Sequence, residues 1–315
     1  MYMRLKKINK MLFVVLTLLW LFSFARLSDN TDYWIIDILS HFPLQYALLA
    51  FVIVLAGLWM RAVPITVLAG LLLVFNLSIF VGPGKAVHAS VPADKTFEVY
   101  SANLHVSNND LSGLKKELRE LDPEMVLLLE VTPRHLDQIR SIIQEYPYHL
   151  EKSFIGKQVI GFVFLSKFPI LSSKVTRLSD ICNFLLEAKV EIDHKPVKFY
   201  GLHARRPDLR GFAERKDQFL RLAADLKEQR LPVIVAGDFN ATPFSPIFRQ
   251  LIGISGMKNS SANFGWQPSW PTYLPFLWIP IDQILLSPGI QVHNRATGSY
   301  IGSDHYPVIA KLFLG

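Results

Sequence analysis

The sequence predicts a layered α/β domain, spanning residues 95–315, that follows an amino-terminal segment embedded in a membrane. Short apolar strands alternate with amphipathic helices beyond residue 95, which is the pattern of α/β architectures. Three long apolar runs precede residue 85. The composition agrees with a membrane segment, because 50% of the 315 residues are hydrophobic and the mean hydropathy is +0.27.

The three apolar runs predict about three transmembrane helices within residues 1–84. They occupy residues 11–27, 44–60 and 63–81. The second and third runs carry no charge and approach the roughly 20 residues that span a hydrocarbon core. A signal peptide is the competing interpretation of the first run, but no small-residue cleavage site follows it closely. We therefore expect the first helix to be retained, and a helical hairpin of a soluble protein is the less favoured alternative.

The distribution of basic residues predicts the orientation of these helices. Four basic residues precede the first run, the loop 28–43 holds three aspartates and no Lys or Arg, and Arg61 lies between the second and third runs. Three crossings place the region after Gly82 on the extracytoplasmic side, and removal of the first helix would leave it there. The Gly-Pro-Gly sequence at 82–84 predicts that residues 85–94 form a linker.

Cysteine content and charge exclude some kinds of site. Cys182 is the only cysteine, so the chain has no intramolecular disulfide and no cysteine-rich metal site. The net charge is +7, but seven basic and three acidic residues precede residue 93, which leaves only +3 for the rest. This mild balance is a weak argument for nucleic acid, because a dedicated nucleic-acid binder usually carries a basic patch.

The pattern from residue 95 onward predicts eight strands and three helices. Alternation and short apolar runs predict strands at 97–104, 125–131, 159–165, 184–192, 197–203, 233–236, 281–286 and 307–313. Amphipathic spacing predicts helices at 111–121, 133–146 and 212–229.

Several of these strands have an acid, an amide or an imidazole at one end. The residues are Asn103, Glu130, His203, Asp238, Asn240, Asp282, Asp304 and His305. Each alone has an ordinary explanation, such as a solvated strand end, a turn residue or a structural hydrogen bond. Together they offer oxygen ligands for a hard cation and imidazoles for proton transfer or phosphate contact. The set therefore favours metal-dependent hydrolytic chemistry.

The order of these motifs resembles the endonuclease/exonuclease/phosphatase superfamily. Gly-Asp-Phe-Asn at 237–240 and Ser-Asp-His at 303–305 carry the resemblance most strongly. Asn103, Glu130, the segment 161–169, His203 and Ile281-Asp282 support it in the same order, so that it covers residues 97–313. The superfamily includes deoxyribonuclease I, abasic-site endonucleases, sphingomyelinases and inositol-polyphosphate phosphatases. The resemblance implies a deoxyribonuclease I-like, four-layer α/β/β/α sandwich with the strand ends gathered in one cleft, and residues 95–315 as the catalytic domain.

The resemblance also implies a divalent metal. Glu130 corresponds to the metal ligand of the family, and Asn103 and Asp304 lie near the ion. Mg²⁺ is the expected ion, with Mn²⁺ as a substitute. Such an ion neutralises charge on a reacting phosphate and positions its oxygens.

Five further residues correspond to catalytic positions of the family. His305 corresponds to a histidine that contacts phosphate or acts as general base, and Asp282 orients it. His203 corresponds to a second imidazole at the scissile phosphate. Asp238 positions or deprotonates the attacking water, and Asn240 stabilises the transition state. Water attacks in line, so no covalent intermediate is needed.

Residues that contact the substrate are less clearly marked. Arg205 and Arg206 follow His203 and have the charge to meet a phosphate, although a solvated position is the ordinary alternative. Residues 264–280 read FGWQPSWPTYLPFLWIP and include Trp270. Their aromatic rings suit the stacking of bases, contact with a lipid surface or the packing of a structural loop. Gln283 stands where many relatives have His or Tyr, which predicts a change in one wall of the cleft.

The resemblance is nearest to bacterial exported or membrane-bound members, in which a Ser-Trp-Pro element also precedes the Ile-Asp strand. It therefore implies a bacterial cytoplasmic membrane, with the catalytic domain on the extracytoplasmic side. Three functions stay open. The first is a nuclease-like phosphodiesterase, and the second is a phosphatase or phosphodiesterase that acts on lipid head groups. The third, a non-catalytic membrane-bound binding module, is disfavoured by the intact motif set.

Overall fold

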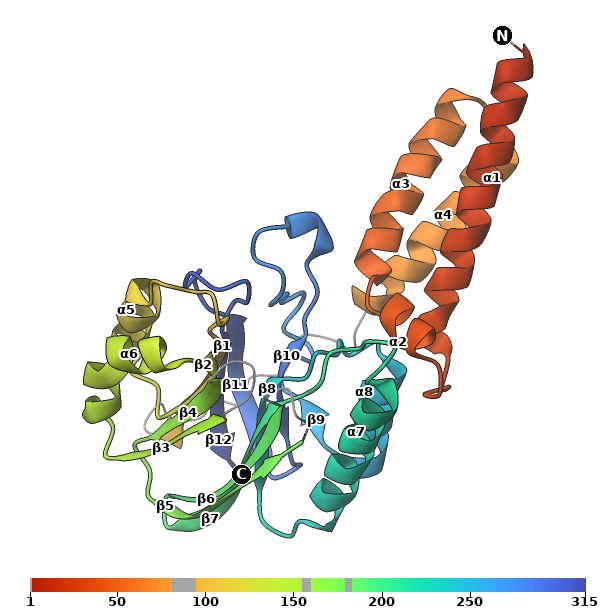
Figure 1. Cartoon of the computed structure of the whole chain (residues 1–315). Helices are drawn as coiled ribbons and strands as arrows, with labels where there is room; N and C mark the ends of the chain where they lie inside the picture. Colours follow the sequence, from red (N-terminus) through yellow and green to blue (C-terminus); the bar gives the residue numbers. More distant parts are fainter. Residues whose placement is uncertain (1, 81–94, 155–159, 179–182) are drawn as a thin grey trace. The chain divides into compact units, whose positions relative to one another are not determined.

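The computed structural model describes residues 2–80, 95–154, 160–178 and 183–315. The chain divides into two compact units (Figure 1). The first comprises Met1–Pro83 with Phe244–Ile247, and the second comprises Gly84–Pro243 with Phe248–Gly315. The predicted linker 85–94 and Cys182 lie outside the described residues.

The first unit is a bundle of apolar helices. Its helices are α1 (Tyr2–Phe24), α2 (Trp34–Ser40), α3 (Pro43–Trp59) and α4 (Val63–Leu77), with short 3-10 turns η1 (Ala25–Leu27) and η2 (Ser78–Phe80). By length and composition, Lys7–Leu27 and Val63–Phe80 can each cross a membrane. A third candidate is formed by α2 and α3, which meet at a 64° bend. The sequence prediction treated residues 28–43 as a plain loop and missed α2, whose seven residues are too few to show a helical period.

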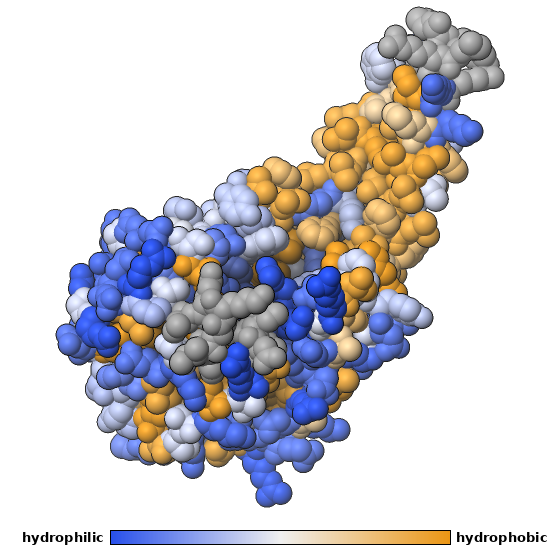
Figure 2. Space-filling view, in the orientation of Figure 1, coloured by the Kyte–Doolittle hydropathy of each residue, from blue (hydrophilic) through white to orange (hydrophobic). Residues whose placement is uncertain are grey.

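Apolar side chains cover the outside of this bundle (Figure 2). Val52 and Val74, for example, are 60% and 68% exposed, which suits a helix surface in contact with lipid. Polar groups are turned inward, where the Asn76 amide donates to the Ser23 hydroxyl at 2.9 Å. Arg26, which interrupts the first apolar run, donates to the Phe75 carbonyl at one end of the bundle.

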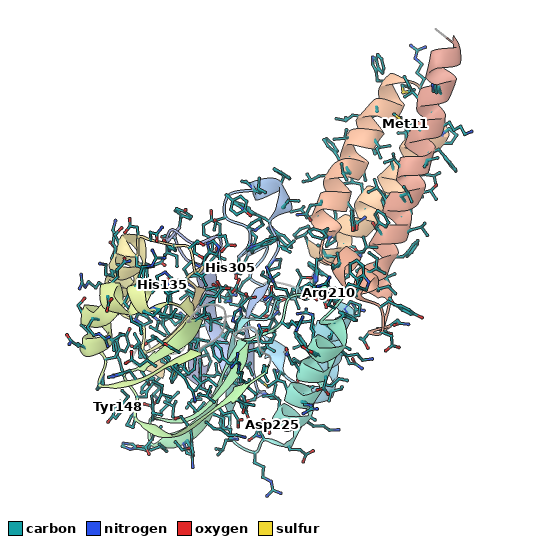
Figure 3. All side chains as sticks on the ribbon, viewed as in Figure 1. Met11, His135, Tyr148, Arg210, Asp225 and His305 are labelled. Atoms are coloured by element: carbon teal, nitrogen blue, oxygen red, sulfur yellow. The ribbon has the colours of Figure 1, made fainter. Side chains whose placement is uncertain are left out.

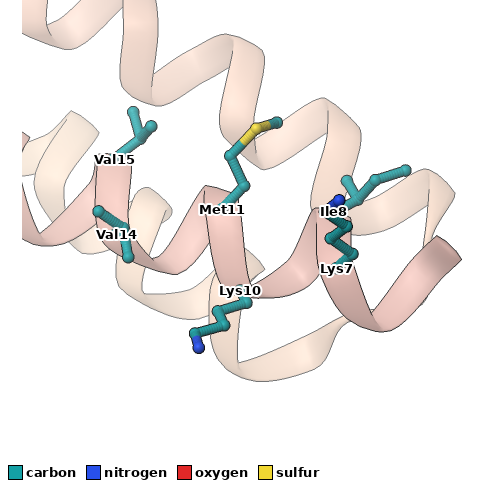
Figure 4. Close-up of a pocket in the computed structure, with 6 residues that line it drawn as sticks. All are labelled: Lys7, Ile8, Lys10, Met11, Val14 and Val15. Atoms are coloured by element: carbon teal, nitrogen blue, oxygen red, sulfur yellow. The ribbon is translucent and has the colours of Figure 1, made fainter. Parts of the chain in front are cut away.

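A surface pocket on α1 offers no chemistry. It is lined by Lys7, Ile8, Lys10, Met11, Val14 and Val15 (Figure 4). All six residues belong to one helix, and none is a carboxylate or an imidazole. We therefore place no functional site there.

The second unit contains two six-stranded sheets flanked by helices. The first sheet has the order β11 (Ile290–Thr297), β12 (Val308–Leu314), β1 (Phe97–Asn103), β2 (Met125–Val131), β4 (Ile160–Ser166) and β3 (Tyr148–Phe154). The second has the order β5 (Ile170–Arg177), β6 (Phe184–Ile192), β7 (Lys195–His203), β8 (Val233–Asp238), β10 (Asp282–Leu286) and β9 (Lys258–Asn259). The flanking helices are α5 (Ser112–Leu121) and α6 (Pro133–Glu145) on one side and α7 (Phe212–Glu228) and α8 (Pro246–Ser255) on the other (Figure 1). This confirms the predicted α/β/β/α sandwich.

Aromatic side chains fill the space between the sheets. Side chains alternate along a strand, so one face of each sheet points inward and can be fully apolar. The rings of Phe164 on β4 and Phe199 on β7 stack at 4.4 Å, and those of Phe162 and Phe184 stack at 4.6 Å. All four side chains are buried. A second apolar layer, on the outer face of the first sheet, holds α5 and α6.

The topology brings several strand ends to one edge. Strands β1 and β2 are parallel and joined through α5, and β7 and β8 are parallel and joined through α7. Strands β10 and β12 run antiparallel to β8 and β1, so they begin where those strands end. Gly237 makes this edge compact, because it has a φ of +138° and a Cβ there would lie 2.0 Å from the Leu202 carbonyl oxygen. Only glycine fits that position.

We predict that Phe164→Ala destabilises the second unit by about 3–5 kcal/mol, because it removes a ring that is fully buried between the sheets. Urea unfolding in detergent, followed by pulse proteolysis, measures this change. Leu171→Ala is the control, since Leu171 is 49% exposed on β5 and should change the free energy of unfolding by less than about 0.5 kcal/mol. Equal losses in the two variants would contradict the packing described here.

Candidate functional site

The strand ends from both sheets are joined by one buried amide. Asn103, at the end of β1, donates from Nδ2 to Glu130 Oε1 at 3.1 Å and to Asp238 Oδ2 at 3.2 Å. Glu130 belongs to the first sheet and Asp238 to the second. The side chain of Asn103 therefore links the two sheets at the edge where the predicted site residues meet.

Glu130 lies at this edge and is partly exposed. Its backbone has a φ of +55°, uncommon for a residue other than glycine, and its Oε2 accepts the Val106 N–H at 3.1 Å. His203 Nε2 lies 3.7 Å from Glu130 Oε1. Burial alone raises the pKa of Glu130, but His203 and the Asn103 amide outweigh it, so the pKa is lowered. The side chain is therefore an anion at neutral pH.

His305, which is labelled in Figure 3, forms a buried pair with Asp282 at the same edge. The distance from His305 Nδ1 to Asp282 Oδ2 is 2.8 Å. Burial works against the imidazolium, but the Asp282 carboxylate and its hydrogen bond outweigh burial and raise the pKa of His305 to about 10. His305 is therefore protonated at neutral pH.

Two serines that the sequence prediction missed support this pair. The Ser269 hydroxyl accepts the N–H groups of Ile281 and Asp282 at 3.1 and 3.0 Å. The Ser303 hydroxyl accepts the N–H of His305 at 3.1 Å and donates to the Asn103 carbonyl at 2.7 Å. Both stand in motifs of the sequence, Ser303 in Ser-Asp-His and Ser269 in Ser-Trp-Pro, but neither motif showed what the hydroxyl bonds.

Asp238 faces Asp282 across the β8–β10 pairing, because the two residues are register partners. Burial and the charge of Asp282 raise the pKa of Asp238 to about 6, although His305, His203 and the Asn240 N–H act in the opposite direction. Asn240 donates to Asp238 from its backbone at 2.8 Å and from Nδ2 at 3.3 Å. The carboxylates of Asp238 and Asp282 and the His305 ring offer ligand atoms within 4.8 Å of one another.

The residues at the open side of the edge fit a hard cation. Asp304 Oδ1 is buried and has no hydrogen-bond donor among the described residues, while Oδ2 accepts the Trp270 Nε1–H at 3.2 Å. The His105 ring lies 3.9 Å from Asp304 Oδ1. An anionic Glu130 and a carboxylate oxygen without a donor are what a divalent cation such as Mg²⁺ requires. The predicted metal ligands Glu130 and Asp304 thus have suitable chemistry, whereas the Asn103 Oδ1 accepts the His105 N–H at 3.0 Å.

The three predicted substrate residues differ in their side-chain contacts and exposure. Arg205 donates from Nη1 to Glu214 Oε2 at 2.7 Å, and its Nε lies 3.5 Å from Asp208 Oδ2. Arg206 is exposed. Trp270 is partly buried and adjoins the site through its hydrogen bond to Asp304.

Gln283 does not form a wall of the cleft. It is fully buried and bonds to Asn259 on β9 and to the Pro280 carbonyl. The difference from relatives at this position therefore affects the pairing of β10 with β9, because the Gln283 side chain bonds to Asn259 of β9.

Comparison with known proteins identifies the family of this chain. A model described as the endonuclease/exonuclease/phosphatase family matches residues 100–305. No curated protein matches significantly. Many solved structures are similar, among them the following three. TDP2 of D. rerio, complexed with a single-strand DNA product, has 20% identity and a TM-score of 0.60 over 70% of this chain and 99% of that chain. An endonuclease/exonuclease/phosphatase of Beutenbergia cavernae has 18% identity and a TM-score of 0.59 over 70% and 72%.

The third solved structure is a mannosyl-6-phosphatase of Bacteroides thetaiotaomicron, with 16% identity and a TM-score of 0.53 over 69% of this chain and 100% of that chain. At these identities the structures show a shared fold. One of these proteins is complexed with a DNA product and another is a mannosyl-6-phosphatase, so the shared fold alone leaves the substrate open.

We predict that Asp282→Asn lowers the pKa of His305 from about 10 toward its ordinary value of about 6.5. The Asp282 carboxylate is the strongest influence that stabilises the imidazolium against burial, and Asp238 and Asp304 act in the same direction to a smaller extent. NMR titration of ¹³C-labelled histidine in chelator measures the pKa, and a His305→Gln spectrum assigns the signal. An unchanged pKa in Asp282→Asn would contradict the pairing.

Proposed function

We propose a function from the premise that this chain belongs to the endonuclease/exonuclease/phosphatase family. It is a phosphoester hydrolase of that family, and the proposed activity is that of a membrane-anchored, divalent-metal-dependent phosphodiesterase. One observation carries the proposal. The Asn103 amide joins Glu130 of one sheet to Asp238 of the other, beside the buried Asp282–His305 pair. The carboxyl groups of Glu130, Asp238 and Asp282 and the protonated imidazole of His305 therefore lie together at one edge of the sheets.

Glu130, Asn103 and Asp304 are proposed to hold the metal. Glu130 is anionic, and Asp304 Oδ1 is a buried oxygen without a hydrogen-bond donor among the described residues. A bound Mg²⁺, or Mn²⁺ in its place, supplies charge neutralisation at the phosphoryl oxygens.

His305 and Asp238 are proposed to divide the proton chemistry. A pKa of about 10 makes His305 an imidazolium at neutral pH, which favours a hydrogen bond to a phosphoryl oxygen over the role of general base. Asp238 has a pKa of about 6, so at pH 7 and above it is ionised and able to accept the proton of the attacking water. Asp282 accepts the Nδ1–H of His305, which fixes the orientation of the ring and stabilises its charged form.

His203 and Asn240 complete the proposed catalytic set. His203 lies between Glu130 and Asp238, with Nε2 3.7 and 4.0 Å from their carboxylates. We place it against the scissile phosphate. Asn240 orients Asp238 through two hydrogen bonds, and we assign its side chain to stabilisation of the transition state.

Two substrate classes remain in the proposal. A nuclease-like activity is supported by the similarity to D. rerio TDP2, which is complexed with a DNA product. An activity on lipid head groups is supported by the segment 269–281, which contains no charged residue. Its Tyr273 and Phe276 side chains are 64% and 62% exposed, and Trp270 connects the segment to Asp304. The uncharged aromatic surface suits a bilayer interface better than a polyanionic backbone.

We propose that the apolar helices hold the enzyme in a bacterial cytoplasmic membrane, with the site on the extracytoplasmic side. The lengths and hydropathy of Lys7–Leu27 and Val63–Phe80, and the bent pair α2–α3, support the crossings. The basic residues before residue 11 and Arg61 support the orientation.

We predict that Glu130→Ala and His305→Ala each lower the turnover of a bis-aryl phosphate to background, because they remove a metal ligand and the imidazolium. EDTA should have the same effect on the wild-type chain, and added Mg²⁺ or Mn²⁺ should restore it. Circular dichroism checks that the variants are folded, and His194→Ala is the control, since His194 is fully exposed. Full activity in both site variants would refute the assignment.

We predict that, if the substrate is nucleic acid, the full chain in detergent nicks plasmid DNA in the presence of Mg²⁺. The same preparation is tested on a panel of other substrates, namely nucleotides, phosphoinositide vesicles and sphingomyelin vesicles. Head-group or phosphate release from vesicles without nicking would replace the nuclease-like activity by the lipid alternative. In that case, Tyr273→Ser with Phe276→Ser should lower turnover on vesicles and leave bis-aryl phosphate turnover unchanged.

We predict that protease added outside spheroplasts digests residues 95–315, because three crossings place them on the extracytoplasmic side. Immunoblotting with an antibody to the carboxyl terminus follows the digestion, and a cytoplasmic protein serves as the control for lysis. Complete protection of the domain in intact spheroplasts would refute the orientation.

A further inference from the structure

The helix that links β7 to β8 carries a fully buried arginine. Helix α7 begins at Phe212, and Arg215 lies in its first turn with no exposed surface. Phe212, Phe219 and Leu222 line the same buried side of the helix, so an apolar residue is the ordinary occupant of this position. A buried guanidinium is costly unless its donors are satisfied, which raises the question of what it bonds.

Arg215 donates to the backbone of the two loops that follow His203 at the end of β7 and Asp238 at the end of β8. Its Nη1 donates to the Phe239 carbonyl at 3.2 Å and its Nη2 to the Asn240 carbonyl at 2.9 Å. Nη1 also donates to the Arg205 carbonyl. Phe239 and Asn240 follow Asp238, and Arg205 follows His203 by two residues. One guanidinium therefore spans the loop after β7 and the loop after β8.

These loops also bond directly to each other beside the arginine. The Ala204 N–H donates to the Asp238 carbonyl at 2.9 Å, and Asn240 Nδ2 donates to the Ala204 carbonyl at 3.1 Å. Asn240 has a φ of +49°, so its backbone takes an uncommon conformation that the surroundings must maintain. The Arg215 hydrogen bonds to residues 239 and 240 stabilise the chain at that point.

Arginine has the geometry for this task and lysine does not. The planar guanidinium presents five N–H donors in a fixed fork, and it stays charged when buried. The group also lies over the Phe219 ring, 4.9 Å from its centroid. A lysine ammonium is a single point with three donors and cannot hold three carbonyls at these separated positions.

We propose that Arg215 is a positioning residue that fixes the spacing between His203 and the Asp238–Asn240 pair. This inference rests on the proposed function, because those three side chains are the ones placed against the reacting phosphate. Arg215 itself is buried behind the loops and acts through their backbone. A displacement of about 1 Å at such groups is enough to lower kcat about a hundredfold.

The test compares Arg215→Lys with Arg221→Lys in the full chain. Arg221 lies on the same helix, 81% of its side chain is exposed, and it pairs with Asp217. Below the melting temperature of both variants, Arg215→Lys should lower kcat on a bis-aryl phosphate about a hundredfold with an unchanged KM. Arg221→Lys should match the wild type. A loss confined to the melting temperature, with kcat within twofold of the wild type, would overturn the proposal.

Hydrogen exchange gives a readout that does not depend on turnover. In Arg215→Lys the amides of Ala204 and Asn240 should exchange about tenfold faster, while those of β2 are unchanged. Unchanged exchange at both amides would overturn the proposal, even if the wild type hydrolysed no substrate and the proposed function failed. If Arg215→Lys does not fold, the wild type decides. Ala204 and Asn240 must then exchange at rates within tenfold of each other, and a larger difference refutes the coupling of the two loops.

Discussion

The hydrogen bonds from the Asn103 amide to Glu130 and Asp238 join the two sheets at the edge on which the site is built. Their existence depends on the packing below them, where Phe162 and Phe164 of one sheet stack on Phe184 and Phe199 of the other. That apolar layer sets the separation between the sheets, and the separation sets whether one amide can reach both carboxylates. The geometry of the site therefore depends on the packing of the core beneath it.

The site concentrates like charges that would repel without compensation. Asp238 and Asp282 are paired across neighbouring strands, and the pKa of Asp238 is raised to about 6 by burial and by Asp282. The pKa of Glu130 moves in the opposite direction, because His203 and the Asn103 amide outweigh its burial. His305 holds a proton between the acids with a pKa of about 10. Different surroundings thus give the carboxyl groups of one small region different proton affinities, which is the condition for dividing acid and base tasks.

The sequence predicted the central strands of the two sheets well and their outer strands poorly. The strand 125–131 and the strand 184–192 have the predicted bounds, because buried strands show apolar runs or strict alternation. The four strands that were missed, β3, β5, β9 and β11, are the outer strands of the two sheets. An outer strand buries less surface, so its sequence carries less of the apolar pattern. Helix α8 was also missed, and α2 is too short to show a helical period.

The residues of the site were named from sequence, but their grouping was not. Motif order identified Glu130, His203 and His305, whereas the bridge formed by Asn103 and the support from Ser269 depend on contacts between distant segments. For Arg205 the sequence left phosphate contact and a solvated position open, and in the structure its guanidinium pairs with Glu214. Arg215 was not singled out, although its place among Phe212, Phe219 and Leu222 on α7 was a signal, since a charged residue on a buried helix face needs an internal partner.

The polar outer strands have a consequence for how this domain behaves in concentrated or partly folded form. Strand β5 exposes most of its side chains and places Lys174 beside Glu187 of β6. Charged side chains on an outer strand discourage a foreign strand from pairing with its free backbone groups. The polarity that conceals β5 from pattern analysis thus protects the sheet against edge-to-edge aggregation, which matters most for a chain whose amino-terminal helices already favour association through their apolar surface.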